Sequence, residues 1–139
     1  MNIKFFFIAK AALQNRIKLK KFIRQLFEHE GCKLGSLVYI FCSDEYLIQL
    51  NNDFLSHNYF TDILTFDLST NEKVIDGEIY ISVDRVKENA KNFKNSFEQE
   101  LHRVIFHGAL HLCGFKDKSK TDTVEMRKKE DEYLGDYFS

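Results

Sequence analysis

The sequence predicts a single α+β domain in which helices pack on a four-stranded, mostly mixed sheet. Three observations indicate this fold class. The 139 residues are enough for one domain and too few for two. Short apolar runs typical of strands come mainly before residue 83, and helical patterns dominate after it. We therefore interpret residues 1–139 as one domain.

The first expected elements are a strand over residues 3–8 and a helix over residues 11–30. The strand segment is the apolar run IKFFFI. The helix segment carries apolar side chains at helical spacing, with lysines on its other side, and Gly31 is typical of a helix end. The apolar stripe consists of Leu13, Ile17, Phe22, Ile23, Leu26 and Phe27.

Three further strands are expected, over residues 36–42, 63–68 and 78–82. A short helix opens at residues 43–45 and ends near residue 52, and a loop over 53–61 follows. The turn at 71–77 is short enough for a hairpin between the last two strands. These segments supply a complete four-stranded sheet.

The rest of the chain is expected to be helical. Ser96 and Gln99 form a capping-box signature that starts a helix ending at Gly114. A last amphipathic helix covers about residues 122–134. The helix before the capping box is lined by Val83, Val86, Ala90 and Phe93.

Composition and cysteine usage indicate a soluble protein of a reducing compartment. Hydrophobic residues make up 44% and charged residues 29% of the chain, as in ordinary globular proteins. No apolar run approaches the roughly 18 residues of a membrane-spanning helix. Cys32, Cys42 and Cys113 form no CxxC motif and are odd in number, which disfavours a disulfide framework. We expect a cytoplasmic protein without a targeting segment.

Charge is unevenly distributed although the net charge is only −1. Residues 1–27 contain seven Lys and Arg and no acid, whereas residues 44–82 contain eight acids and one lysine. Two interpretations of the basic segment are open: a face that follows an RNA backbone, or a solvated helix face.

The segment around His107 and His111 predicts a metal site. Residues four apart on a helix lie one turn apart on the same side, so both imidazoles can reach one ion. Gly114 can turn the chain sharply and return Asp117 as a third ligand. The pattern H-x3-H-x2-G-x2-D has the spacing of the long zincin motif, with aspartate in the last place. The three ligands would hold Zn²⁺ with one position open for water, although nickel, cobalt or iron would also suit them.

Neighbouring residues limit the alternatives. Cys113 and His102 are offset around the helix from the His pair, and neither is expected to ligate. Asp117 could instead pair with a neighbouring surface lysine. Gly108 occupies the place where metalloproteases carry their glutamate base, so a peptidase is disfavoured.

The segment around the His pair resembles the YbeY family of rRNA maturation factors, whose signature is H-G-x-L-H-L-x-G-[YF]. Other blocks of that family appear in the same order at residues 50–51 (LN), 61–66 (TDILTF) and 77–82 (GEIYIS). The resemblance covers about residues 38–134. It implies a zincin-like fold and a metal-dependent, single-strand-specific endoribonuclease. It also implies a role in maturing the 3′ end of small-subunit rRNA and in ribosome quality control, in the cytoplasm.

The chain departs from the family pattern at three positions. Asp117 replaces the third histidine, and carboxylate is also a zinc ligand. Phe60 replaces a proline. Leu55 stands where the family commonly has an arginine for RNA phosphate, and leucine cannot bind phosphate. His57 could substitute for that arginine if protonated, or be an ordinary loop histidine.

The candidate groups for proton transfer and substrate contact lie in the resembling blocks. Asp62 and Glu78 could move protons, and Thr61 could hydrogen-bond substrate; capping or sheet-edge hydrogen bonding is the alternative for all three. The cations expected to contact RNA are Arg16, Lys18, Lys20, Lys21 and Arg24.

Two functions from different classes remain open on the sequence. One is the endoribonuclease, acting on rRNA and the small ribosomal subunit, without a membrane. The other is a non-catalytic assembly factor, in which the metal braces the fold and the basic face docks on rRNA or a ribosomal protein. An open three-ligand metal site favours the enzyme, whereas the missing arginine favours the assembly factor.

Overall fold

The computed structural model describes residues 2–55 and 61–139, apart from the side chains of residues 54 and 55. Its sheet contains β1 (Asn2–Phe7), β2 (Leu34–Cys42), β3 (Ile63–Asp67) and β4 (Ile75–Ser82) in the order β1-β2-β4-β3. β1, β2 and β4 run parallel, and β3 pairs antiparallel with β4. The predicted α+β class and the mixed four-stranded sheet are therefore confirmed.

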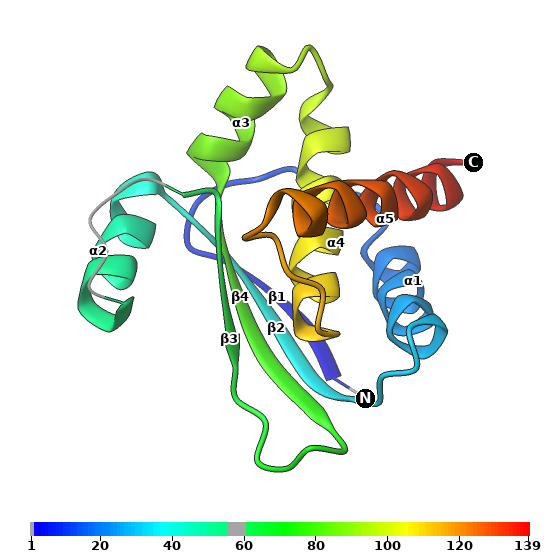
Figure 1. The fold of residues 1–139 in the computed structure, drawn as a ribbon. Coiled ribbons are helices and arrows are strands. Elements are labelled where there is room, and N and C mark those ends of the chain that lie inside the picture. Colours follow the sequence, from blue (N-terminus) through cyan, green and yellow to red (C-terminus); the bar gives the residue numbers. More distant parts are fainter. Residues whose placement is uncertain (1, 56–60) are drawn as a thin grey trace.

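Five helices surround this sheet in the described part of the chain: α1 (Arg16–His29), α2 (Asp44–Leu55), α3 (Val83–Asn92), α4 (Phe97–Leu112) and α5 (Lys120–Phe138). Figure 1 shows α4 in front of the sheet, with α1 on one side of it and β3 on the other. α5 crosses α4, and α2 lies apart on the other face of the sheet. None of the described helices is long and apolar enough to cross a membrane.

The side chains of β4 alternate between the two faces, as a strand requires. Ile79 and Ile81 are buried in the main core, which also contains the apolar face of α4. Tyr80, between them, packs with Leu47 of α2 in a smaller cluster. The face that carries α4 is therefore distinct from the face that carries α2.

The first helix begins at Arg16, and its predicted start at residue 11 is wrong. Asn15 has a left-handed backbone (φ 53°), which separates the preceding segment from the helix. Ile17 was expected in the apolar stripe but is 88% exposed. The buried stripe consists of Leu19, Ile23, Leu26 and Phe27, and Ile17 lies about 200° around the helix from Leu19.

Other predicted boundaries also move. α2 continues to Leu55, through the start of the predicted loop, and β4 begins at Ile75 rather than at residue 78. α5 extends beyond 122–134 at both ends. Phe93 was expected on the apolar side of α3, but it follows the last helical residue and is 57% exposed.

Two local features hold α4 in place. Ser96 caps its first turn by accepting a hydrogen bond from the backbone N–H of Gln99 at 3.0 Å, which confirms the serine half of the capping box. Gly108 lies against the sheet: a Cβ there would come within 2.9 Å of Ile79 Cδ1 and 3.0 Å of Ile63 Cδ1. Glycine therefore lets the His-bearing helix lie directly on β3 and β4.

Candidate metal centre

α4 presents His107 and His111 on one side, one turn apart. Asp117 lies opposite both rings, with its carboxylate oxygens 3.2 Å from His107 Nε2 and 3.7 Å from His111 Nε2. One ligand atom from each residue falls within a group that spans at most 4.8 Å. The structure thus brings together the three residues that the spacing predicted.

The turn after α4 returns Asp117 to the helix. Gly114 has a left-handed backbone (φ 100°) and donates its N–H to the carbonyl of His111 at 3.0 Å. Phe115 N–H donates to the carbonyl of Leu110 at 3.1 Å, which closes the turn. Thr123 in α5 donates to the Asp117 carbonyl at 3.2 Å. Asp117 is therefore held from both helices.

The Nδ1 atom of each histidine makes a hydrogen bond to another part of the protein. His107 Nδ1 lies 2.6 Å from Glu130 Oε2, and His111 Nδ1 lies 2.7 Å from the carbonyl of Phe115. Carboxylate and carbonyl oxygens can only accept, so both Nδ1 atoms donate. In the neutral rings the Nε2 lone pairs then face Asp117, which is the arrangement that metal-binding histidines need. The residues present fit a divalent metal ion.

Glu130, on α5, is a buried partner of this site that the sequence analysis did not find. Arg103 Nη1 donates to Glu130 Oε1 at 3.0 Å, and its other terminal nitrogen pairs with Asp131 at 2.8 Å. Burial lowers the pKa of His107, but the hydrogen bond and charge of Glu130 outweigh burial and raise that pKa above its ordinary value. Glu130 lies 23 residues from His107, so no local spacing indicates the contact.

Asp62, immediately before β3, lies beside the metal ligands. Its backbone carbonyl accepts from Ser82 N–H at 3.0 Å, and Asn89 of α3 donates to its carboxylate at 3.4 Å. Burial raises the pKa of the Asp62 carboxyl, although the nearby His107 lowers it. The prediction that Asp62 belongs to a site with the His pair thus has a geometric basis.

These groups line one cleft of about 320 Å³ between α3, α4 and α5. It opens beside His107 and Asp117 and is the place where a substrate could meet the metal ligands. Its lining residues are Asp62, Asn89, Phe93, Glu100, Arg103, Val104, His107, Asp117, Thr123, Met126, Arg127 and Glu130.

The other candidate catalytic residues are placed differently. Thr61 precedes Asp62 and donates to the carbonyl of Ile63 at 3.3 Å. The two strand neighbours of Glu78 are on the face of the sheet that carries α4. Gly77 packs near Leu112 of α4, and Ile79 belongs to the main core. Glu78 therefore faces away from α4 and accepts a hydrogen bond from Tyr80 at 3.0 Å. The structure does not bring Glu78 to the His pair.

The cations expected to contact RNA belong to α1, and this helix lies on the side of α4 opposite β3 (Figure 1). Three of them pack on aromatic rings: Arg16 on Phe7, Lys18 on Tyr137 and Lys20 on Phe5. The structure therefore does not bring this helix to the metal ligands. His57 lies outside the described residues, and Leu55 is the last residue of α2.

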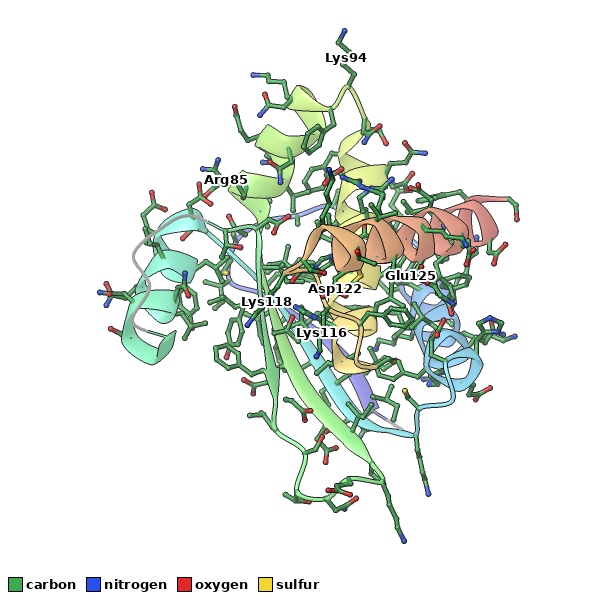
Figure 2. All side chains as sticks on the ribbon, in the orientation of Figure 1. Arg85, Lys94, Lys116, Lys118, Asp122 and Glu125 are labelled. Carbon is green, nitrogen blue, oxygen red and sulfur yellow. The ribbon has the colours of Figure 1, made fainter. Side chains whose placement is uncertain are left out.

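Two lysines next to Asp117 in the sequence lie closer to the site than the basic residues of α1 do. Figure 2 shows Lys116 and Lys118 on the connection between α4 and α5, on either side of Asp117 in the sequence. Both are exposed. They provide positive charge beside the metal ligands.

His102 and Cys113 stay away from the ligands, as expected. His102 is buried, its Nδ1 bonds to the carbonyl of Glu98 at 2.7 Å, and its ring stacks on Tyr137. Cys113 caps the end of α4, and its backbone carbonyl lies 4.0 Å from Cys32 Sγ. All three cysteines are free thiols.

The fold and the site together define the class of zincin-like, metal-dependent hydrolases. A family model described as "Endoribonuclease YbeY" matches residues 7–137, nearly the whole chain. The chain belongs to the endoribonuclease YbeY family, and the resemblance seen in the sequence is confirmed. The comparisons support the enzyme and do not favour the non-catalytic assembly factor.

Individual relatives support the same assignment. A protein of Cytophaga hutchinsonii named Endoribonuclease YbeY is 48% identical over 88% of this chain and 85% of its own length. A protein of Karelsulcia muelleri with the same name is 44% identical over 95% of this chain and 93% of its own. A solution structure from Thermotoga maritima covers 99% of this chain and 89% of its own, with a TM-score of 0.65 and 28% identity.

Proposed function

We propose that this chain hydrolyses phosphodiester bonds of single-stranded RNA at the metal centre formed by His107, His111 and Asp117. The observation that carries the proposal is that His107 and Asp117, two members of this group of three ligands, line a cleft that also contains Asp62. A site of three protein ligands leaves coordination positions open, which distinguishes a catalytic site from a closed structural one.

The metal in this proposal is one Zn²⁺ ion. Two imidazoles and one carboxylate suit zinc, and nickel, cobalt or iron would fit the same donors. When bound, the ion supplies Lewis-acid chemistry, since it polarises a phosphate oxygen and makes water more acidic. His107 and His111 would hold it through Nε2, and Asp117 would hold it through a carboxylate oxygen.

Asp62 is the proposed proton acceptor. The carboxylate lies in the cleft beside His107 and Asp117, where it could take a proton from a substrate water, and burial raises its pKa in the metal-free protein. Gly108 has no side chain that could accept a proton, and position 108 faces Ile79 and Ile63 of the sheet. In the proposed step, Asp62 accepts a proton from the water that attacks phosphorus, and Thr61 holds the adjacent backbone. The bond from phosphorus to the leaving ribose oxygen breaks, and that oxygen takes up a proton from solvent.

The proposed substrate is the 3′ end of small-subunit rRNA, on the small ribosomal subunit in the cytoplasm, with a role in ribosome quality control. Lys116 and Lys118 flank the metal ligand and can contact phosphates next to the cleaved bond. The basic residues of α1 lie beside β1, at the edge of the sheet opposite to Asp62. They are therefore proposed to contact RNA beyond the cleaved nucleotide, or a ribosomal protein, and His57 is a further proposed phosphate contact.

The test is cleavage of a single-stranded rRNA 3′ precursor by the wild type and by the His111→Ala variant, each with and without a chelator. We expect metal-dependent cleavage by the wild type only. His29→Ala is the matched control, because His29 is an exposed histidine on α1 and not a candidate ligand. Equal cleavage by the wild type and the His111→Ala variant, or none by the metal-loaded wild type, would overturn the proposal.

The role of Asp62 is tested by the pH dependence of cleavage. A base must be deprotonated, so activity should fall as the pH decreases through the pKa of Asp62 in the metal-loaded enzyme, which gives the pH profile an acid limb. Asp62→Asn should lower kcat by roughly 10²- to 10⁴-fold and remove that limb. Metal content measured at each pH separates this effect from loss of the ion as His107 takes up a proton. An acid limb that persists in the variant at full metal content would contradict the assignment.

A further inference from the structure

The cleft has an aromatic rim that the metal chemistry does not use. Phe93 lines the cleft at the end of α3 and is 57% exposed, an unusual position for a large apolar ring. Within the described part of the chain, no ring-to-ring contact involves Phe93. Figure 2 shows the next residue, Lys94, extending away from the molecule at the end of α3, so the rim is open to solvent there.

The position of Phe93 relative to Asp62 is set by α3. Asn89 donates to the Asp62 carboxylate at 3.4 Å, and Phe93 N–H donates to the carbonyl of Asn89 at 2.9 Å. Four residues of helix advance about 6 Å along the axis. Phe93 therefore lies one turn further from the metal ligands than Asn89, along the same wall of the cleft.

A cation lies on the facing wall. Arg127 of α5 lines the cleft, is 54% exposed, and reaches Glu130 only at 4.0 Å, the outer limit of an ion pair. Arg103, by contrast, is held by Glu130 and Asp131 at 3.0 and 2.8 Å. Arg127 is thus the cleft arginine whose guanidinium is accessible to a phosphate.

We infer that Phe93 and Arg127 form a nucleotide subsite next to the metal centre, in which a base stacks on Phe93 and the adjoining phosphate pairs with Arg127. This inference rests on the proposed function and adds the group that selects single strands. Aromatic side chains bind bases of any sequence because every base has a π-face. A base can reach the Phe93 ring only after leaving its own stack, so a base paired in a duplex is excluded.

The first test uses the absence of tryptophan from the chain. Phe93→Trp supplies a single tryptophan at the rim and keeps an aromatic face. With chelator present to prevent cleavage, its fluorescence should be quenched by a single-stranded oligoadenylate and not by the duplex of that strand with oligouridylate. Phe6→Trp is the matched control, because Phe6 is 53% exposed but lies on the edge strand β1, and its fluorescence should not change. Quenching of both variants, or of neither, would overturn the inference.

The second test is kinetic. Phe93→Ala should raise KM for single-stranded RNA by roughly 10- to 100-fold while leaving kcat and metal content close to wild type. Phe93→Trp should restore KM, and Phe6→Ala should leave it unchanged. Wild-type cleavage with an unchanged KM in Phe93→Ala would overturn the subsite and leave the proposed function standing. Quenching without cleavage by the metal-loaded wild type would support the subsite and overturn the proposed catalysis.

Discussion

At the scale of single residues, His107 has two different partners. Its Nε2 faces Asp117, and its Nδ1 donates to the buried carboxylate of Glu130. A carboxylate behind a metal-binding histidine fixes the ring orientation and makes the ring a stronger ligand. Arg103 neutralises the same carboxylate, so the buried Glu130 does not stand as an uncompensated charge. Glu130 is therefore a positioning residue for the proposed metal site.

Replacing Glu130 tests this role. Glu130→Gln keeps the size of the side chain but removes its charge, and we expect metal affinity to fall by about 10- to 100-fold. The measurement is a competition titration with a chromophoric chelator, at a pH where His107 is neutral in both proteins. Asp131→Asn is the matched control, because Asp131 also pairs with Arg103, whereas the carboxylates that pair with His107 in the described part of the chain are Asp117 and Glu130. Unchanged metal affinity in Glu130→Gln would contradict the role.

The same variant has a defined pH signature in the metal-free protein. The folded-state pKa of His107 is raised, so protonated His107 contributes stability that is fully present below the unfolded pKa of about 6.5 and lost as pH rises through the folded pKa. The loss in unfolding free energy caused by Glu130→Gln should therefore be largest at low pH and shrink as pH rises. Denaturant unfolding over a pH series measures it, and a pH-independent difference would contradict the pairing.

At the scale of elements, the packing of α4 on the sheet places the His pair. Gly108 faces β3 and β4, so the positions on either side of it, including His107, are directed elsewhere around the helix. A larger residue at 108 would move α4 away from the strands. This explains in physical terms why the position that is a glutamate in metalloproteases is a glycine in this chain.

Two glycine-to-alanine substitutions distinguish the effect of packing on stability from the effect of helix propensity. Gly108→Ala should destabilise the protein by about 1–3 kcal/mol, because its Cβ would meet Ile79 and Ile63 at 2.9–3.0 Å. Gly135→Ala, inside α5 with no atom within 4 Å of the new Cβ, should stabilise it by about 0.5–1 kcal/mol. Denaturant titration of both variants gives the comparison. If Gly108→Ala instead stabilised the protein, the space between α4 and the sheet would be large enough for a Cβ, which would contradict the close packing.

At the scale of the whole molecule, the fold places the basic helix α1 far from the acidic residue Asp62 of the cleft. The basic α1 packs beside β1, whereas the acidic residue Asp62 precedes β3 at the opposite edge of the sheet. Figure 1 shows α1 and β3 on opposite sides of α4. The net charge of −1 conceals this separation. RNA that reaches the metal centre and also contacts α1 would have to pass around α4.

Charge reversal on α1 tests whether RNA follows that route. Lys20→Glu combined with Lys21→Glu should weaken binding of single-stranded RNA most strongly at low salt. The slope of log affinity against log salt should fall by about 0.7 for each lost phosphate contact. Because α1 is remote from the ligands, kcat at saturating RNA should not change.

The control for this pair reverses two exposed lysines outside α1. Lys33→Glu with Lys73→Glu makes the same change in net charge, on the loop before β2 and in the β3–β4 connection. Equal weakening by both double variants would attribute the effect to net charge and remove α1 from the proposed RNA path.

Local patterns in the sequence were sufficient for the fold class, the four strands and the spacing of the metal ligands. Periodicity reports which side of an element is buried, and the four-residue spacing of His107 and His111 is a property of any α-helix. Boundaries of elements that depend on the backbone conformation of one residue were predicted less accurately. The left-handed Asn15 comes directly before the start of α1, and the spacing of apolar residues does not indicate it.

Only the tertiary structure decided what surrounds the ligands. Glu130 contacts His107 from α5. Asp62, at the edge of the sheet, and Phe93, at the end of α3, line the same cleft as His107, so the cleft joins segments far apart in the sequence. The structure also removed Glu78 from the site, because strand alternation places it on the face opposite α4. The sequence by itself determined which residues could bind a metal, since their spacing follows from the geometry of one helix and one turn. Packing between helices determined which groups could act beside the metal, because long-range contacts have no fixed spacing along the chain.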